Sequence, residues 1–248
     1  MAQDGLKRQV IVDPAIGAIE IKITARAKDE EEVREALDSA EIEAERREIF
    51  FFDTPELDLF ESGLVLRARR IDGGADDSTV KLRPVDPAEL PKMWVEMPGF
   101  EVELDAVGEE SICSAKLSVE QRGGEIGDVA EGKRAIRALF SREQERLIAE
   151  HRPEGVAWDD IRVFGPVAVR KWEFEPKSLD YEVTVEEWVL PDDSDLVELS
   201  VKAPPAQAGT AADAFLAFLR KRGVDTEGAQ QTKTRSALRY FTTGEGIA

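Results

Sequence analysis

The sequence predicts an α+β fold in which about eight strands form an antiparallel sheet, with helices at the joints between strands. Strand-like segments with alternating polar and apolar side chains recur along the chain, for example at residues 64–70 and 78–83. The polar face of each such strand tends to carry charges of a single sign. Segments with a helical spacing of apolar residues, such as 29–40 and 211–221, lie between or after the strands.

The N-terminal elements follow from local patterns. Isoleucine occupies every second position of residues 18–24, which predicts a strand with one apolar face. A helix is expected at 29–40, where Asp29 can cap the N-terminus and apolar residues recur every three to four positions. A strand at 45–52 then leads to Pro55, which favours a turn or the start of a helix.

Two neighbouring strands, joined by a turn rich in glycine and aspartate, carry four cations. Arg67 and Arg69 share one face of the first strand, and Lys81 and Arg83 share one face of the second. Residues two apart on a strand lie about 6.5–7 Å from each other. Like charges this close repel each other unless an anion meets them, so the four residues predict an anion-binding surface.

The rest of the chain alternates strands and helices. On the strand at 100–105, Glu101, Glu103 and Asp105 share one face. Residues 108–153 are expected to form a helical insertion, because the spacing of their apolar residues is helical. The remaining elements are strands at 163–174, 180–190 and 195–203 and helices at 211–221 and 230–241.

The composition limits the classes of function. The chain of 248 residues has 33 Lys and Arg against 52 Asp and Glu and a net charge of −19, which disfavours general binding to nucleic acid or anionic membranes. The single cysteine, Cys113, excludes an intrachain disulfide, and the single histidine, His151, excludes a multi-histidine metal site. Because no segment has the length and hydrophobicity of a membrane span or a signal peptide, we expect a cytoplasmic protein with one domain over residues 1–248.

Strand faces that carry charges of a single sign are compatible with two arrangements of the sheet. In an open sheet, the apolar face packs on a core and the charged face lies in water. In a closed barrel, the charged face lines the interior and helices cover the apolar outside. The grouping of like charges, together with helices that need an apolar surface to pack on, favours the barrel. Its basic walls would bind phosphate oxygens, and its grouped carboxylates would hold Mg²⁺ or Mn²⁺.

Several motifs occur in an order that is typical of one protein family. The most specific part is Phe52-Asp53-Thr54-Pro55-Glu56-Leu57, followed by Leu64-Val65-Leu66-Arg67-Ala68-Arg69 and Lys81-Leu82-Arg83. Phe100-Glu101-Val102-Glu103, Val183-Thr184-Val185-Glu186 and Thr232-Lys233 follow. Together they resemble the CYTH superfamily, the triphosphate tunnel metalloenzymes, over roughly residues 16–241, least so at 108–153. The resemblance implies a closed antiparallel barrel with helices packed on the outside, which takes a triphosphate group into a tunnel with a divalent metal.

The resemblance also implies roles for the charged residues. Phosphate binding is expected from Lys22, Arg67, Arg69, Lys81, Arg83, Arg170 and Lys233, with inward salt bridges to the glutamates as the alternative. Mg²⁺ or Mn²⁺ is expected on Glu20, Glu101, Glu103, Glu186 and Glu198, with structural ion pairs as the alternative. Lys22 and Lys233 are also candidate catalytic residues, since a lysine with a lowered pKa can act as a general base.

Two positions depart from the family pattern. The opening Glu-x-Glu-x-Lys motif reads Ala18-Ile19-Glu20-Ile21-Lys22, and a later Glu-x-Glu pair reads Glu198-Leu199-Ser200. Each change removes one carboxylate. Fewer oxygen ligands weaken or alter the binding of a divalent metal, so these departures bear on catalysis rather than on the fold.

The expected function is therefore metal-dependent hydrolysis of inorganic triphosphate, a nucleoside triphosphate or thiamine triphosphate. Three alternatives remain: a non-catalytic binder of polyphosphate or nucleoside triphosphate with a degenerate metal site, a class IV adenylate cyclase, and a partner protein whose acidic exterior docks on a basic surface. Hydrolysis is favoured over cyclisation because no motif marks a pocket for a nucleotide base. The expected partner is a small triphosphate-containing molecule; the oligomeric state is open, with a homodimer among the options.

Overall fold

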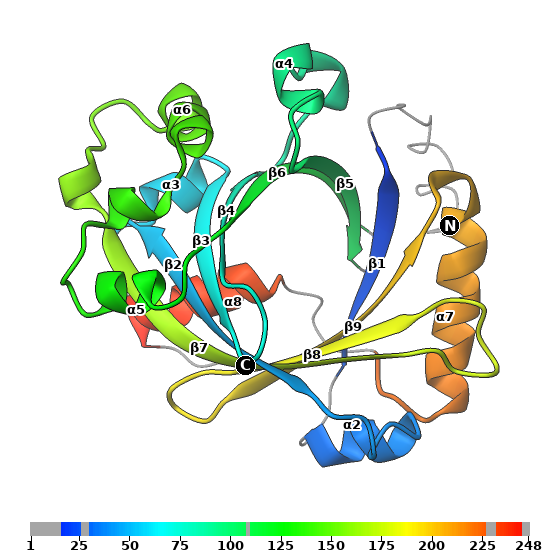
Figure 1. Ribbon diagram of the computed structural model, residues 1–248. Helices are drawn as coiled ribbons and strands as arrows, with labels where there is room; N and C mark the ends of the chain where they lie inside the picture. Colours follow the sequence, from blue (N-terminus) through cyan, green and yellow to red (C-terminus); the bar gives the residue numbers. More distant parts are fainter. Residues whose placement is uncertain (1–15, 26–29, 108–109, 227–231, 245–248) are drawn as a thin grey trace.

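The computed structural model describes residues 16–25, 30–107, 110–226 and 232–244, and within them nine strands close into a barrel (Figure 1). Around the ring, the strand order is β1-β5-β6-β4-β3-β2-β7-β8-β9. The strands are β1 (Ala18–Ala25), β2 (Glu45–Asp53), β3 (Leu64–Ile71), β4 (Asp77–Leu82), β5 (Phe100–Val107), β6 (Glu110–Glu120), β7 (Arg162–Phe174), β8 (Val183–Val189) and β9 (Asp195–Ala203).

Within the described residues, helices lie in the connections β1–β2, β2–β3, β4–β5 and β6–β7, and further helices follow β9. They are α2 (Glu30–Ala36), α3 (Asp58–Glu61), α4 (Lys92–Val95), α5 (Glu125–Ala130), α6 (Arg142–His151), α7 (Ala208–Lys221) and α8 (Lys233–Thr243), with short 3-10 turns η1 (Pro87–Glu89), η2 (Ile136–Leu139), η3 (Trp158–Asp160) and η4 (Pro205–Gln207). The expected cap of the first helix, Asp29, and the expected start of the last helix at residue 230 lie outside the described residues. None of the helices in the described ranges is long and apolar enough to cross a membrane.

The closed barrel confirms the predicted fold class, with two differences in detail. The ring has nine strands rather than about eight, and β1 runs parallel to β5 while every other neighbouring pair is antiparallel. The alternation of polar and apolar residues is the same for both directions of pairing, so it does not distinguish a parallel neighbour from an antiparallel one.

The segment 108–153 is helical only in its second half. It begins with β6, which forms a hairpin with β5, and then continues through α5, η2 and α6. Within β6, Ala115 and Leu117 are buried on the outer side, while Lys116 pairs in register with Lys81 of β4 and lies on the opposite face. The expectation of a fully helical insertion was wrong for residues 110–120, because the period-two pattern of this strand is weaker than the helical pattern after residue 125.

The apolar outer faces of the strands form the core under the helices. Ile19, Ile21 and Ile23 of β1 pack in one cluster with Phe215 and Leu219 of α7. Leu64, Leu66 and Val80 pack in a second cluster with Leu147 and Ile148 of α6. Burying one such side chain contributes about 1.5–3 kcal/mol, so these clusters hold the charged faces of the strands toward the interior.

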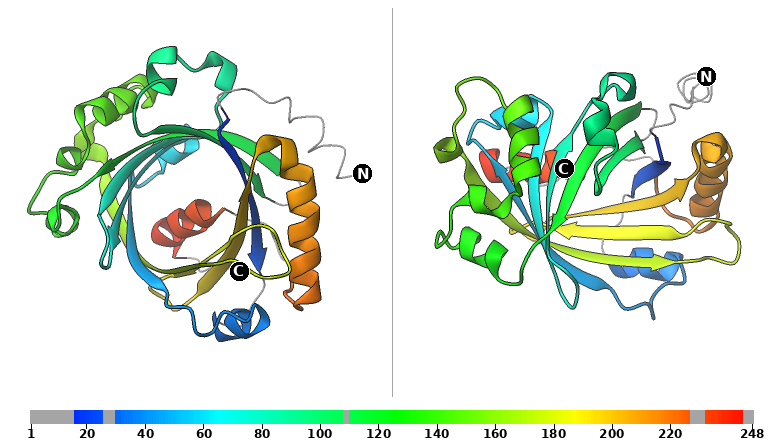
Figure 2. Two further views of the ribbon diagram at one scale, coloured as in Figure 1. Left: turned by 45° about the vertical axis from the view of Figure 1, so that its right-hand side comes forward. Right: turned by 45° about the horizontal axis from the view of Figure 1, so that its top comes forward.

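Helix α8 differs from the others because it lies inside the ring of strands (Figure 2). Its Ala237 and Leu238 pack in a third cluster with Ile49 and Phe51 of β2, Val169 of β7 and Trp188 of β8. Phe51 is paired with Arg67 and Val169 with Trp188, so these apolar residues belong to the interior face of the barrel. The helices pack on the outside of the barrel as predicted, except that α8 fills part of the interior.

Asp53, in the Phe52–Leu57 motif of the family resemblance, has a structural role. Its carboxylate accepts hydrogen bonds from the backbone N–H groups of Thr54, Leu59 and Phe60 at 2.7–2.9 Å. Burial raises the pKa of this carboxyl above its ordinary value, against the opposing effect of those three bonds. Asp53 thus fixes the turn from β2 into α3 and does not reach the interior cluster described below.

Candidate functional site

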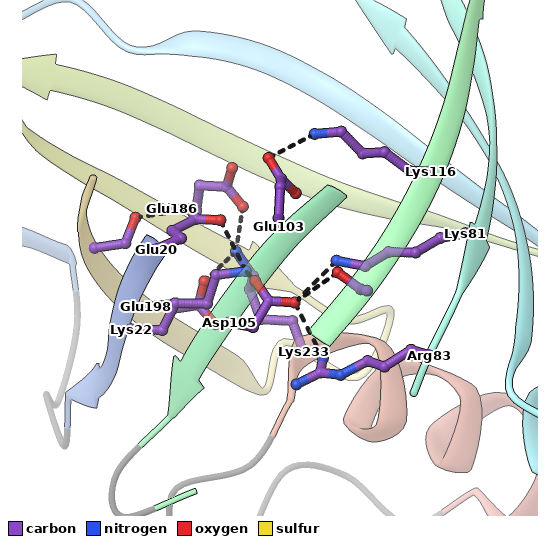
Figure 3. A network of polar contacts seen from close by, with 12 residues as sticks. Glu20, Lys22, Lys81, Arg83, Glu103, Asp105, Lys116, Glu186, Glu198 and Lys233 are labelled. Atoms are coloured by element: carbon purple, nitrogen blue, oxygen red, sulfur yellow. Dashed lines mark hydrogen bonds and ion pairs between the residues drawn. The ribbon is translucent and has the colours of Figure 1, made fainter. Parts of the chain in front are cut away.

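The interior of the barrel holds a cluster of charged side chains drawn from strands far apart in the sequence. We call it the tunnel cluster, and Figure 3 shows its members: Glu20, Lys22, Lys81, Arg83, Glu103, Asp105, Lys116, Glu186, Glu198 and Lys233. They come from β1, β4, β5, β6, β8, β9 and α8, with Arg83 directly after β4. The side chains of its five cations are 14–22 % exposed, so solvent reaches them within the barrel.

Asp105 on β5 is the residue that the largest number of cations contact in this cluster. Its fully buried carboxylate lies 2.8 Å from Lys22 Nζ, 3.0 Å from Lys81 Nζ and 3.8 Å from Arg83 Nη1. The Ser114 hydroxyl donates a further hydrogen bond to it at 3.3 Å. Burial alone would raise the pKa of the Asp105 carboxyl, but the charges of Lys22, Lys81 and Arg83 outweigh burial and hold this pKa well below its ordinary value.

Lys233, the first residue of α8, joins two carboxylates on neighbouring strands. Its Nζ contacts Glu186 of β8 and lies 2.7 Å from Glu198 of β9, and these two glutamates are directly paired in register. The ammonium also lies 5.3 Å from the centroid of the Trp188 ring, whose indole N–H donates to Glu186. The helix, the ring and two carboxylates together fix the position of this lysine.

The surroundings of Lys22 and Lys233 keep both lysines protonated. Burial would lower the pKa of Lys22, but Glu198, Glu20 and Asp105 raise it above its ordinary value. Burial would also lower the pKa of Lys233, but the charges of Glu186 and Glu198 outweigh burial and raise this pKa above its ordinary value. A general base needs the opposite shift, so this geometry does not support that role for either lysine.

Lys81 behaves differently from these two lysines. Burial lowers its pKa, and the neighbouring positive charge of Lys22 adds to the effect, although Asp105 opposes it. Lys81 shares Asp105 with two other cations, so the carboxylate neutralises it only in part. An additional anion beside Lys81 would therefore be favourable.

A second group of cations, Arg67 and Arg69, lies on β3. Arg69 forms a two-nitrogen contact with Asp77, at 2.5 Å from Nη2 to Oδ2, while Arg67 has its Nε buried without a hydrogen-bond partner among the described residues. Burial and the neighbouring Arg69 lower the pKa of the Arg67 guanidinium to about 10, so it remains charged at neutral pH. A buried charged donor that lacks a partner is costly, which marks this point of the interior as a place for an anion.

The structure brings most of the predicted residues to the interior and separates two of them. Glu101 pairs with Lys116 at 3.1 Å, but its side chain is 58 % exposed. Arg170 lies on the outer face of β7, where it pairs with Glu187 of β8 at 2.6 Å. It lines an outer hollow of about 810 Å³ together with Arg34 and Arg46. Arg170 therefore does not join the predicted phosphate-binding residues, because the register of β7 points it away from the interior.

Two members of the cluster were missed as site residues in the sequence. Asp105 shares the charged face of β5 with Glu103, and this alternation is the signal that indicates it as a site residue. Lys116, which lies 2.9 Å from Glu103, sits on the strand that was expected to be helical. The alternation of Ser114, Lys116 and Ser118 with Ala115 and Leu117 is the signal that could have found it.

The carboxylates do not fit a divalent metal as they are arranged. Among the described residues, no group of three or more carboxylate, histidine or cysteine side chains has the spacing of a metal site. Glu20, Glu103, Glu186 and Glu198 each contact a lysine instead. At the position of the second missing carboxylate, the Ser200 hydroxyl donates to Glu20 at 3.2 Å.

Comparisons with known proteins place the fold. No family model and no curated protein matches the chain. Among solved structures, it is similar to a candidate adenylyl cyclase from Hippeastrum described as having a dominant triphosphatase activity, at 17% identity and a TM-score of 0.64, covering 92% of this chain and 96% of that one. It is also similar to a candidate adenylate cyclase from Bacillus halodurans, at 12% identity and a TM-score of 0.59, covering 89% of this chain and 97% of that one. The chain thus has the closed-barrel fold of these proteins, the fold that its resemblance to the CYTH superfamily predicts.

Proposed function

We propose that this protein is a phosphohydrolase that binds the triphosphate group of a small molecule inside its barrel. The observation that carries the proposal is Arg67, a half-buried side chain beside Arg69 whose buried Nε has no hydrogen-bond partner among the described residues. A phosphate chain supplies the oxygen acceptors that such a donor lacks. The triphosphatase activity of the Hippeastrum protein, which has the same fold, supports the choice of substrate class.

The cations bind the phosphate chain and stabilise the charge of the transition state. Arg67 and Arg69 hold one part of the phosphate chain, and Lys81 and Arg83 hold another part from the adjoining strand. Charge that builds up on the transferred phosphoryl oxygens is stabilised by these fixed cations in a site of low dielectric constant. Lys22 and Lys233 act as permanent positive charges, since their carboxylate neighbours keep them protonated. The attacking group is water.

A non-catalytic binder is the second candidate. It is favoured by the donor set, in which Ala18 and Ser200 replace carboxylates of the family pattern and lysines contact the glutamates that remain. Such a protein would keep the basic interior and lose turnover. Mg²⁺ or Mn²⁺ as a cofactor stays a prediction from the resemblance.

Phosphate release decides between the two candidates. The purified protein is incubated with tripolyphosphate, ATP or thiamine triphosphate, each with Mg²⁺, Mn²⁺ or EDTA, and free phosphate is measured beside a thermal melt. Turnover that is lost in Arg67→Met and kept in Arg70→Met supports the phosphohydrolase. Arg70 is the matched control because it lies on the same strand with an exposed side chain that pairs with Glu48.

The remaining outcomes separate the alternatives. Thermal stabilisation by tripolyphosphate without phosphate release supports the binder. Formation of cyclic AMP from ATP without hydrolysis of tripolyphosphate would point to a cyclase. Absence of both stabilisation and turnover with every triphosphate would contradict the proposed function.

A further inference from the structure

The glutamates at one side of the tunnel cluster already have counter-ions that belong to the protein. Lys233 lies between Glu186 and Glu198, and Lys22 lies 3.0 Å from Glu20 and 2.8 Å from Asp105. Figure 3 shows these ammonium groups among the carboxylates, where a divalent ion would need to sit to be held by several of them. Carboxylates that are each engaged with an ammonium have fewer lone pairs free for a metal.

The two lysines are held in these places by more than the ion pairs. Lys233 begins α8, and α8 is anchored by Ala237 and Leu238 in the apolar cluster inside the barrel. Lys22 lies on β1, which is paired on both edges, to β5 and to β9. Removing either ammonium from its carboxylates would leave uncompensated buried charge, which is costly.

The charges of the tunnel cluster are also balanced without a metal. Its cations are Lys22, Lys81, Arg83, Lys116 and Lys233, and its carboxylates are Glu20, Glu103, Asp105, Glu186 and Glu198, one for each cation. The nearby Arg67, whose Nε lacks a hydrogen-bond partner among the described residues, adds positive charge for an incoming anion. A metal ion is therefore not needed to offset repulsion among the glutamates.

We propose that the barrel binds a phosphate chain without a divalent cation held by the protein, because Lys22 and Lys233 occupy the place and supply the charge that such a cation would have. The ligand is a linear polyphosphate group in its metal-free form, contacted by Arg67, Arg69, Lys81 and Arg83. This inference rests on the proposed binding of a triphosphate group in the barrel. It adds that the metal-free anion is the form bound.

The test compares tripolyphosphate binding by calorimetry in EDTA and in excess Mg²⁺. We expect the affinity in EDTA to equal or exceed that in Mg²⁺, because Mg²⁺ competes with the lysines and arginines for phosphate oxygens. A loss of about tenfold or more in EDTA would overturn the inference, since 1.4 kcal/mol is tenfold in affinity, and would leave the proposed function standing. No binding under either condition would overturn both.

A variant provides a second, independent measurement. Lys233→Met leaves Glu186 and Glu198 side by side without their ammonium, so Mn²⁺ is expected to stabilise the ligand-free variant in a thermal melt but not the wild type. The control is Lys221→Met, a lysine exposed at the end of α7 on the outside of the barrel. Equal stabilisation of the wild type and Lys233→Met by Mn²⁺ would count against the inference. Should Lys233→Met fail to fold, the calorimetric comparison of the wild type decides alone.

Discussion

At the scale of single residues, the buried Asp105 and the half-buried Arg67 are interior charges in contrasting surroundings. Asp105 has no exposed side-chain surface, and Lys22, Lys81 and Arg83 surround its carboxylate. Arg67 has Arg69 as its strongest charged neighbour, and its Nε has no hydrogen-bond partner among the described residues. The first residue should therefore stabilise the empty protein, and the second should destabilise it while serving the ligand.

Asp105→Asn is expected to destabilise the protein at neutral pH by about 3–5 kcal/mol, because it leaves three cations without their shared carboxylate. The folded-state pKa of Asp105 is lowered, so its contribution is present above the ordinary value of 3.8 and is lost as the pH falls below that value. Denaturant melts from about pH 6 to about pH 3 should show a steeper loss of stability in the wild type than in Asp105→Asn. The exposed Asp72→Asn serves as control, and an equal slope in all three proteins would refute this account.

Arg67→Met is expected to have the opposite effect on the empty protein. Removing a charged group whose buried Nε lacks a hydrogen-bond partner among the described residues, with a side chain of similar length, should raise the free energy of unfolding by about 1 kcal/mol. The same variant should lose the stabilisation by tripolyphosphate that the wild type shows. Thermal melts of both proteins with and without tripolyphosphate measure this. A less stable variant that still responds to tripolyphosphate would show that Arg67 is a structural residue.

At the scale of elements, α8 links the apolar interior to the charged cluster. Leu238, in the middle of the helix, is 2 % exposed and packs against the interior face of the barrel, while Lys233 at the first position of the helix reaches Glu186 and Glu198. Packing of the helix therefore sets the position of the lysine. The amphipathic pattern alone indicated a helix here but did not indicate which side of the sheet it covers.

Leu238→Ala is expected to lower the free energy of unfolding by about 2–5 kcal/mol through the cavity it leaves. Because the substitution weakens the packing of α8, which positions Lys233, it should also weaken tripolyphosphate binding. The neighbouring Arg239→Ala, at an exposed position of the same helix, should change stability by no more than about 0.5 kcal/mol. Denaturant unfolding and calorimetry of both variants are the measurements. If Leu238→Ala cost no more than Arg239→Ala, the helix would not be packed in the barrel.

At the scale of the whole molecule, an acidic protein encloses a cluster of cations. The net charge is −19, yet the interior cations are matched by carboxylates of the cluster. The excess of negative charge therefore lies elsewhere on the molecule, where it repels itself and any approaching anion. Salt reduces both the self-repulsion and the repulsion of an approaching anion. Salt also weakens the interior contacts between the cations and a bound anion.

Raising NaCl from about 0.05 M to about 0.5 M should thus act in opposite directions on the free and the bound protein. The melting temperature of the free protein should rise by about 2–4 °C, equivalent to about 1 kcal/mol for a chain of this size, because screening reduces self-repulsion. The further rise caused by tripolyphosphate should shrink. A salt series of thermal melts measures both. A ligand-induced rise that is insensitive to salt would contradict binding through charged groups.

The sequence by itself determined which residues share a face of each strand. That information is local, since side chains alternate with a period of two whatever the strand pairs with, and it placed Arg67 with Arg69 and Glu101 with Glu103. It also identified most members of the tunnel cluster. Among the strands in the described residues, the sequence failed to predict β6, because a helical pattern follows β6 in the same segment.

Only the tertiary structure decided which charges meet. Lys22 and Asp105 are 83 residues apart, and their contact depends on β1 lying parallel to β5 when the ring closes. The outward direction of Arg170 depends on the register of β7 against β8, and the place of Lys233 depends on α8 entering the barrel. Pairing, register and closure arise from contacts between distant segments, for which a local pattern carries no information.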